Sequence, residues 1–119
     1  MSKELDETKK ASTSLPSVYQ RIVNEYPAVA AAHDQMADAV EGVGPLDAKT
    51  CSLIKIGISV GAGLESAVRS HVRRATQAGA TRVEITQAIF LGMNTVGFPR
   101  TVSAWSWAQT QFDRDDKES

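Results

Sequence analysis

The sequence has one cysteine, few aromatic residues and no long apolar run. Of its 119 residues, 6% are aromatic, and no apolar stretch reaches the roughly 18 residues that a transmembrane helix needs, so we expect no membrane span. A single cysteine forms no internal disulfide, and the polar start MSKELDETKK has no apolar signal region, so we expect a cytoplasmic protein. The net charge of -1 argues against a large nucleic-acid interface.

The charged residues that are present gather at the two ends. Residues 1–10 hold six charges and residues 113–118 hold six more, whereas residues 11–112 hold 15. We therefore predict flexible polar tails over 1–14 and 113–119 around one folded domain over 15–112. Because so small a domain has much surface to cover, its low charge indicates that other copies cover part of it, as in a homo-oligomer.

The central region lacks hairpin turns between alternating apolar runs, and it contains many helix start and stop signals. Proline precedes or opens several segments, glycine closes others, and Thr81 with Glu84 has the spacing of a capping box. These signals predict an all-α fold of about six helices, over residues 17–26, 28–42, 48–63, 64–78, 83–97 and 100–112.

The segment 64–78 places one histidine on an apolar stripe. The stripe has the i, i+3, i+4, i+7 spacing of a buried helix face and consists of Leu64, Ala67, Val68, His71, Val72, Ala75 and Ala78. Arg69, Arg73 and Arg74 fall outside it. His71 therefore points inward, either as a core histidine with one satisfied hydrogen bond or as a functional acid–base group.

Cys51 is a second candidate for chemistry. Asp47 can cap the helix 48–63, which places Cys51 near its first turn, where the helix dipole favours a thiolate. Cys51 also shares the spacing of Ile54, Ile58 and Gly61, which predicts a buried stripe and an inert thiol. Both interpretations remain open at this point.

Other residue types give weaker signals. Trp105 and Trp107 are two residues apart, so one is expected to pack inside while the other lines an interface or pocket, with Met93 and Phe98 as further apolar wall. The two histidines lack close ligand partners, so we predict no metal site. The glycine segments lack the spacing of a phosphate loop, and we predict no cofactor.

The segment from Leu46 to Pro99 resembles the carboxymuconolactone decarboxylase family, which includes the alkylhydroperoxidase D-like proteins. The matching pieces are PLDAKTCSLIKIGISVGAG, SHVRRATQAGATRVEITQAIFLG and GFP, and the run HVRRA is the most specific of them. The resemblance implies an all-α bundle that assembles into trimers or hexamers. It also implies an active site in the helical core or near a subunit boundary.

Within this family, the peroxidase branch uses a C-x-x-C pair, a histidine four positions later and a glutamate twelve positions before the pair. Here the cysteine positions are Leu64 and Ala67, the glutamate position is Ser52, and the histidine is His71. Without the thiol pair, peroxidase activity by that mechanism is not expected.

The lactone decarboxylase branch also lacks the cysteine pair, and its H-x-R pattern matches His71 and Arg73. This resemblance implies a cofactor-free lyase acting on a small lactone or unsaturated carboxylic acid, with His71 as acid–base group. Arg73, Arg69 and Trp105 are then the candidate substrate-binding residues. Two alternatives remain: a non-catalytic oligomeric family member, and a redox protein that works with Cys51 alone.

Overall fold

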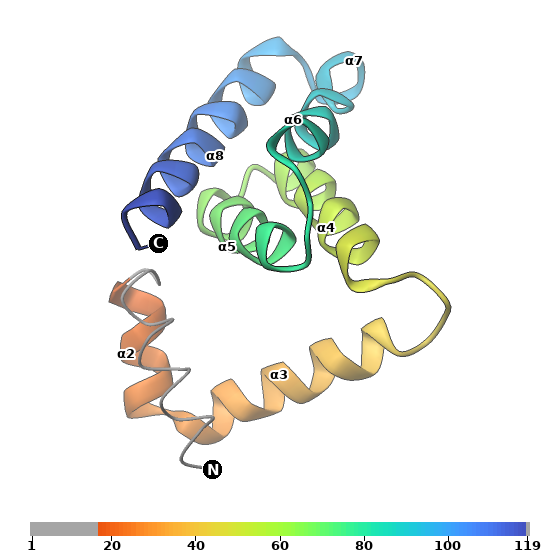
Figure 1. Cartoon of the computed structure of the whole chain (residues 1–119). Coiled ribbons are helices and arrows are strands. Elements are labelled where there is room, and N and C mark those ends of the chain that lie inside the picture. Colours follow the sequence, from red (N-terminus) through yellow and green to blue (C-terminus); the bar gives the residue numbers. More distant parts are fainter. Residues whose placement is uncertain (1–16, 119) are drawn as a thin grey trace. The chain divides into compact units, whose positions relative to one another are not determined.

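The structure is a computed structural model that describes residues 17–118, and every described element in it is a helix (Figure 1). These helices are α2 (Ser17–Glu25), α3 (Pro27–Glu41), α4 (Ala48–Ala62), α5 (Glu65–Gln77), α6 (Arg82–Phe90), α7 (Met93–Val96) and α8 (Phe98–Glu118). The predicted all-α fold is confirmed. None of the helices between Ser17 and Glu118 combines the length and apolar character needed to cross a bilayer.

Chain contacts divide the molecule into two compact units, whose described parts we call the hairpin (residues 17–45) and the body (residues 46–117). In the hairpin, the amide of Tyr26 donates to the carbonyl of Ile22, and Pro27 starts α3 directly afterwards. Proline suits this first helical position because its missing N–H would have no partner within the helix. No described side chain of the hairpin is buried.

The body contains the hydrophobic core. Helices α4 and α5 pack together, and α6 also packs on α4 (Figure 1). The buried apolar residues come from α4, α5, α6 and α8 and from the turn before α6: Ile56, Val60, Val68, Val72, Ala75, Ala80, Ile85, Ile89, Ala104, Ala108 and Phe112. On α8 they recur every four residues, which gives this helix one buried face.

Two side-chain contacts hold α8 against the body at its two ends. Near its start, Arg100 donates a 3.0 Å hydrogen bond to the carbonyl of Gly61 at the end of α4. Near its end, Asp116 pairs with Arg82, the first residue of α6, whose guanidinium also lies over the Phe112 ring. These contacts join segments that lie 34 and 39 residues apart in the sequence.

Helix α4 ends at a glycine that has two reasons to lack a side chain. Gly63 has φ of 71°, in the left-handed region that favours glycine. A Cβ placed there would lie 2.6 Å from a terminal nitrogen of Arg100. The end of α4 and the start of α8 are therefore fitted to each other.

The prediction that Ile54 and Ile58 belong to a buried stripe of α4 is wrong. Ile54 is 47% exposed and Ile58 is 64% exposed, and the buried face is instead formed by Ser52, Ile56, Ser59 and Val60. The Ser59 hydroxyl donates to the Lys55 carbonyl, so its burial leaves no unsatisfied donor. Both faces of α4 carry apolar residues, and one of them remains exposed in the single chain.

Three other local predictions also need correction. Leu64 is 54% exposed and caps α5 instead of belonging to its buried stripe. The helix predicted over 83–97 is divided into α6 and α7 by a turn at Leu91 and Gly92. The last helix does not end at residue 112, because α8 continues to Glu118, supported by the Arg82–Asp116 pair and a hydrogen bond from Gln111 to Asp115.

The predicted capping box at the start of α6 is confirmed. The Thr81 hydroxyl accepts from the Glu84 amide at 3.1 Å, and the Glu84 carboxylate accepts from the Thr81 amide at 2.8 Å. We expect Thr81→Ala to lower the free energy of unfolding by about 1 kcal/mol, because the cap acceptor is lost. Urea denaturation checks this, with Thr81→Ser as the control that keeps the hydroxyl. Equal stability of the two variants would contradict the expected role of the cap.

Candidate functional site

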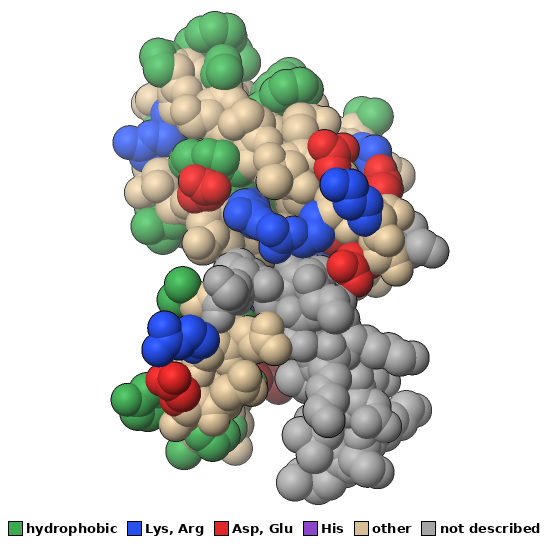
Figure 2. All heavy atoms as spheres, turned by 90° about the vertical axis from the view of Figure 1, so that its left-hand side faces the viewer, with side chains coloured by type: hydrophobic (Ala, Val, Ile, Leu, Met, Phe, Trp, Pro, Cys, Tyr) green, Lys and Arg blue, Asp and Glu red, His purple; other side chains and the backbone are tan. Residues whose placement is uncertain are grey.

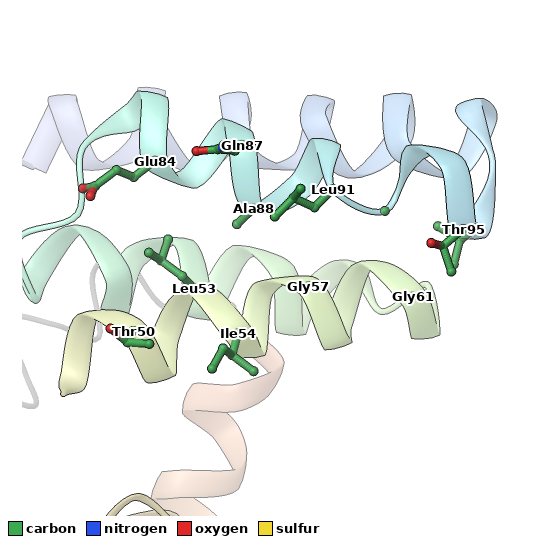
Figure 3. Close-up of a pocket in the computed structure, with 12 residues that line it drawn as sticks. Thr50, Leu53, Ile54, Gly57, Gly61, Glu84, Gln87, Ala88, Leu91 and Thr95 are labelled. Atoms are coloured by element: carbon green, nitrogen blue, oxygen red, sulfur yellow. The ribbon is translucent and has the colours of Figure 1, made fainter. Parts of the chain in front are cut away.

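The body contains an open groove of about 540 Å³ between α4 on one side and α6 and α7 on the other (Figure 3). Leu53 from α4 and Ala88 from α6 point into it, together with Leu91 just after α6. Its lining residues are Thr50, Leu53, Ile54, Gly57, Gly61, Glu84, Gln87, Ala88, Leu91, Gly92, Thr95 and Val96. The lining is mainly apolar and contains one ionisable side chain, Glu84.

Glu84 forms a polar end to this groove. Its carboxylate lies 3.1 Å from the Lys49 ammonium and also accepts the Thr81 amide of the capping box. The Thr81 amide first, and then Lys49, hold the pKa of Glu84 below its ordinary value. Glu84 is therefore a charged structural carboxylate at neutral pH, and it does not supply a proton to a ligand in the groove.

This lowered pKa predicts an acid-sensitive contribution to stability. A depressed folded pKa stabilises the fold above the unfolded value of about 4.3, and the contribution is lost as pH falls through the folded pKa. We expect wild type to exceed Glu84→Gln in stability near pH 7, and the difference to shrink as the pH falls toward 3. Glutamine keeps an acceptor at the capping position, so the comparison isolates the charge. Denaturation midpoints across this range measure it, and a constant difference would contradict the prediction.

Helix α5 carries the histidine and the arginines that the sequence singled out. His71 is half-buried and its Nδ1 atom is enclosed by protein. The Arg69 side chain is 16% exposed, and one of its terminal nitrogens lies 3.8 Å from the Glu65 carboxylate. The Arg69 Nε atom is buried and has no hydrogen-bond partner among the described residues.

The arginines of α5 divide over two flanks of its buried stripe. At about 100° per residue, Arg69 and Arg73 lie on one flank, and His71 and Arg74 lie on the other. None of these four residues lines the groove. Trp105 does not line it either: it lies on α8 and is 41% exposed, whereas Trp107 packs against the core. The structure therefore separates the predicted site residues from the groove.

Cys51 lies in the first part of α4, and the predicted cap is present there, because Asp47 accepts the Thr50 amide at 2.8 Å. The Cys51 thiol is half-buried and donates to the Leu46 carbonyl at 3.6 Å. It does not line the groove. Within residues 17–118, no group of three or more His, Cys, Asp or Glu side chains lies close enough together to hold a metal ion.

The groove is the feature that the sequence did not predict. It forms where three helices meet, and its members are spread over residues 50–61 and 84–96. One local signal was available: Gly57 and Gly61 are four residues apart on α4, and a Cβ at either would have no atom within 4 Å. Two helical glycines on one exposed face leave the backbone of α4 bare along the groove.

Comparison with known proteins adds a family match. The family model described as carboxymuconolactone decarboxylase family matches residues 27–110. An uncharacterized 15.0 kDa protein in the nqo9-nqo10 intergenic region of Paracoccus denitrificans is 43% identical over 75 residues. These residues cover 61% of this chain and 56% of that relative, so the chain spans little more than half of the relative's length. No solved structure shows significant similarity.

Proposed function

Because the chain belongs to the carboxymuconolactone decarboxylase family, we propose that it is a cofactor-free lyase acting on a small lactone or unsaturated carboxylic acid. His71 is the acid–base group, and the arginines of α5 hold a substrate carboxylate. The observation that carries this proposal is that one helix, α5, holds the half-buried His71 together with three partly exposed arginines. The lack of a C-x-x-C pair in this sequence argues against the thiol chemistry of the peroxidase branch.

The chemistry needs three contributions from the protein. An arginine binds a carboxylate of the substrate through its planar pair of donors. The bond between the ring carbon and the leaving carboxylate breaks, and its electron pair passes into the conjugated system as an enolate while CO₂ departs. The His71 imidazolium then gives its proton to carbon and recovers one from solvent. The substrate supplies the electron sink, so no redox step is required.

The placement of His71 and the arginines on two flanks of α5 supports a substrate position between two copies. His71 and Arg69 are two residues apart, so their side chains leave the helix about 160° from each other. A substrate held by both residues therefore lies between His71 of one copy and Arg69 or Arg73 of another. The proposal accordingly includes self-association into a trimer or hexamer, with the exposed Trp105 as a further candidate for the substrate contact.

A second candidate is a non-catalytic oligomeric family member. The groove favours it, because its lining is mainly apolar and includes neither His71 nor any of the three arginines of α5. A protein whose open surface is apolar is suited to bind another helix instead of a small carboxylate.

An ultraviolet assay of lactone consumption tests the proposal directly. The full chain is mixed with 4-carboxymuconolactone and with close unsaturated carboxylic acids, and CO₂ release is measured in parallel. Turnover with stoichiometric CO₂ supports the lyase. Absence of turnover for the whole series, with calorimetry showing no carboxylate binding, would favour the non-catalytic candidate.

A further inference from the structure

The hairpin lacks a core of its own. No side chain described within it is buried, and α3 contributes none to any core. Six large apolar side chains of α2, α3 and the residue between these helices are 42–69% exposed: Val18, Ile22, Tyr26, Val29, Met36 and Val40. Helices of nine and 15 residues are marginal in water unless an apolar face packs against another element. The hairpin therefore needs a partner surface.

The exposed face of α3 has the pattern of a helix that packs closely on another. Val29, His33, Met36 and Val40 follow a 4-3-4 spacing, so they form one stripe along the helix. The valines and the methionine are 59–61% exposed. Alanines flank this stripe, and the acidic residues Asp34, Asp38 and Glu41 lie outside it. The small alanine side chains allow another helix to pack close to α3. No carboxylate lies on the stripe, so this packing buries no negative charge.

The groove offers a surface of matching character and length. Its α4 wall runs from Thr50 to Gly61, eleven residue steps, and the α3 stripe also covers eleven steps, so each is about 16 Å long. The bare backbone at Gly57 and Gly61 can receive the larger side chains of α3. Ile58 on α4 and Leu91 after α6 are both more than 60% exposed, so both can pack against a helix that docks in the groove.

The two units also carry opposite charge. Residues 17–45 contain one basic and four acidic residues, a net charge of -3. Residues 46–117 contain nine basic and six acidic residues, a net charge of +3. Figure 2 shows Lys and Arg side chains across one face of the body, with Asp and Glu side chains between and beside them. This difference favours contact between a hairpin and a body over contact between two hairpins.

A reciprocal exchange also provides enough area. The three large apolar side chains of the stripe, each about 60% exposed, present on the order of 300 Å² of apolar surface in each hairpin. Two copies that exchange hairpins form this contact twice and bury both partner surfaces. The total is then about 1,200 Å², the lower end of the range typical of a stable interface.

We propose that the α2–α3 hairpin of one copy docks through the Val29–Val40 stripe of α3 into the α4–α6 groove of a second copy. This arrangement covers the exposed stripe of the hairpin and the exposed face of α4 with a single contact. The inference rests on the self-association included in the proposed function, but it does not depend on the lyase chemistry.

Light scattering on the full chain tests the docking. We expect wild type to contain an even number of chains at micromolar concentration, with a mass of at least twice the 12.8 kDa of one chain. Met36→Glu places a charge on the stripe, Gly57→Glu fills the groove, and both variants should fall to the mass of one chain. Glutamate is a better helix former than glycine, and position 57 has open space, so loss of assembly in that variant is not loss of fold.

Ala31→Glu is the matched control, because residue 31 lies on the opposite side of α3 and is exposed. It should keep the wild-type mass. A monomeric wild type would overturn the inference, as would oligomers of unchanged mass for both Met36→Glu and Gly57→Glu.

Cross-linking separates exchange between copies from docking within one copy. In a Cys51→Ser background, one preparation carries Met36→Cys and another carries Gly57→Cys, and a short bis-maleimide is added to the mixture. We expect a product of twice the chain mass that contains one of each copy. A third preparation carries both cysteines in one chain. A cross-link that forms only within that chain, with no product of twice the chain mass in the mixture, would overturn the exchange. Lactone turnover is measured on the same samples. An assembled wild type without turnover would reject the lyase and leave the docking, whereas unchanged masses and full turnover for both Met36→Glu and Gly57→Glu would reject the docking and leave the lyase.

Discussion

Replacing His71 with alanine is expected to lower kcat for the lactone substrate by at least about 100-fold, because positioned proton transfer typically contributes 10²–10⁴ to a rate. His71 has the features that this role needs: it is half-buried on α5, and its Nδ1 atom is enclosed by protein. The KM should change much less than kcat, because substrate binding is assigned to arginine and not to histidine.

Gln77→Ala is the control on the same helix, because Gln77 is exposed on α5 and belongs neither to the groove nor to the proposed substrate contact. It should retain wild-type kcat. A pH profile gives an independent readout: kcat of wild type should fall as the pH rises through the pKa of the essential histidine, because the proton donor is the imidazolium. Turnover in His71→Ala that equals wild type would remove His71 from the mechanism.

The largest effect on stability is expected for Ile85→Ala. Ile85 is fully buried in α6 and belongs to the core that also contains Ile56 and Val72. Removing its side chain loses apolar burial and leaves a cavity, which costs about 2–5 kcal/mol. A domain of this size has a total stability of about 5–15 kcal/mol, so the variant should unfold at a much lower urea concentration.

The same helix supplies the control for this substitution. Val83 is two residues away and 78% exposed, so Val83→Ala should change the free energy of unfolding by less than about 0.5 kcal/mol. Circular dichroism during urea titration measures both variants. Similar midpoints for the two would mean that the described core does not hold the body together.

Sequence reasoning succeeded where structure depends on neighbouring residues. The cap of α4 at Asp47 and the capping box at Thr81 were both predicted, because each is formed within four residues by groups of known chemistry. The family match likewise agrees with the resemblance carried by the segment from Leu46 to Pro99.

Sequence reasoning failed where two faces of one helix compete. On α4 the apolar spacing of Ile54 and Ile58 predicted burial, yet the core uses Ile56 and Val60 beside two serines. Periodicity cannot distinguish a face that enters the core of the same chain from one left for another contact. The end of α8 was missed for a related reason, since Asp116 is held by Arg82 from a distant part of the sequence.

The contact between Gly63 and Arg100 has a consequence for how this sequence can diverge. A substitution at position 63 would displace the guanidinium from the carbonyls of Val60 and Gly61, and it would also strain a left-handed backbone. Changing Arg100 first would clear the space but leave the backbone strain. We therefore expect relatives in which position 100 varies while glycine is kept at position 63. A substitution at position 63 is disfavoured whether or not Arg100 is retained, because the left-handed backbone remains strained.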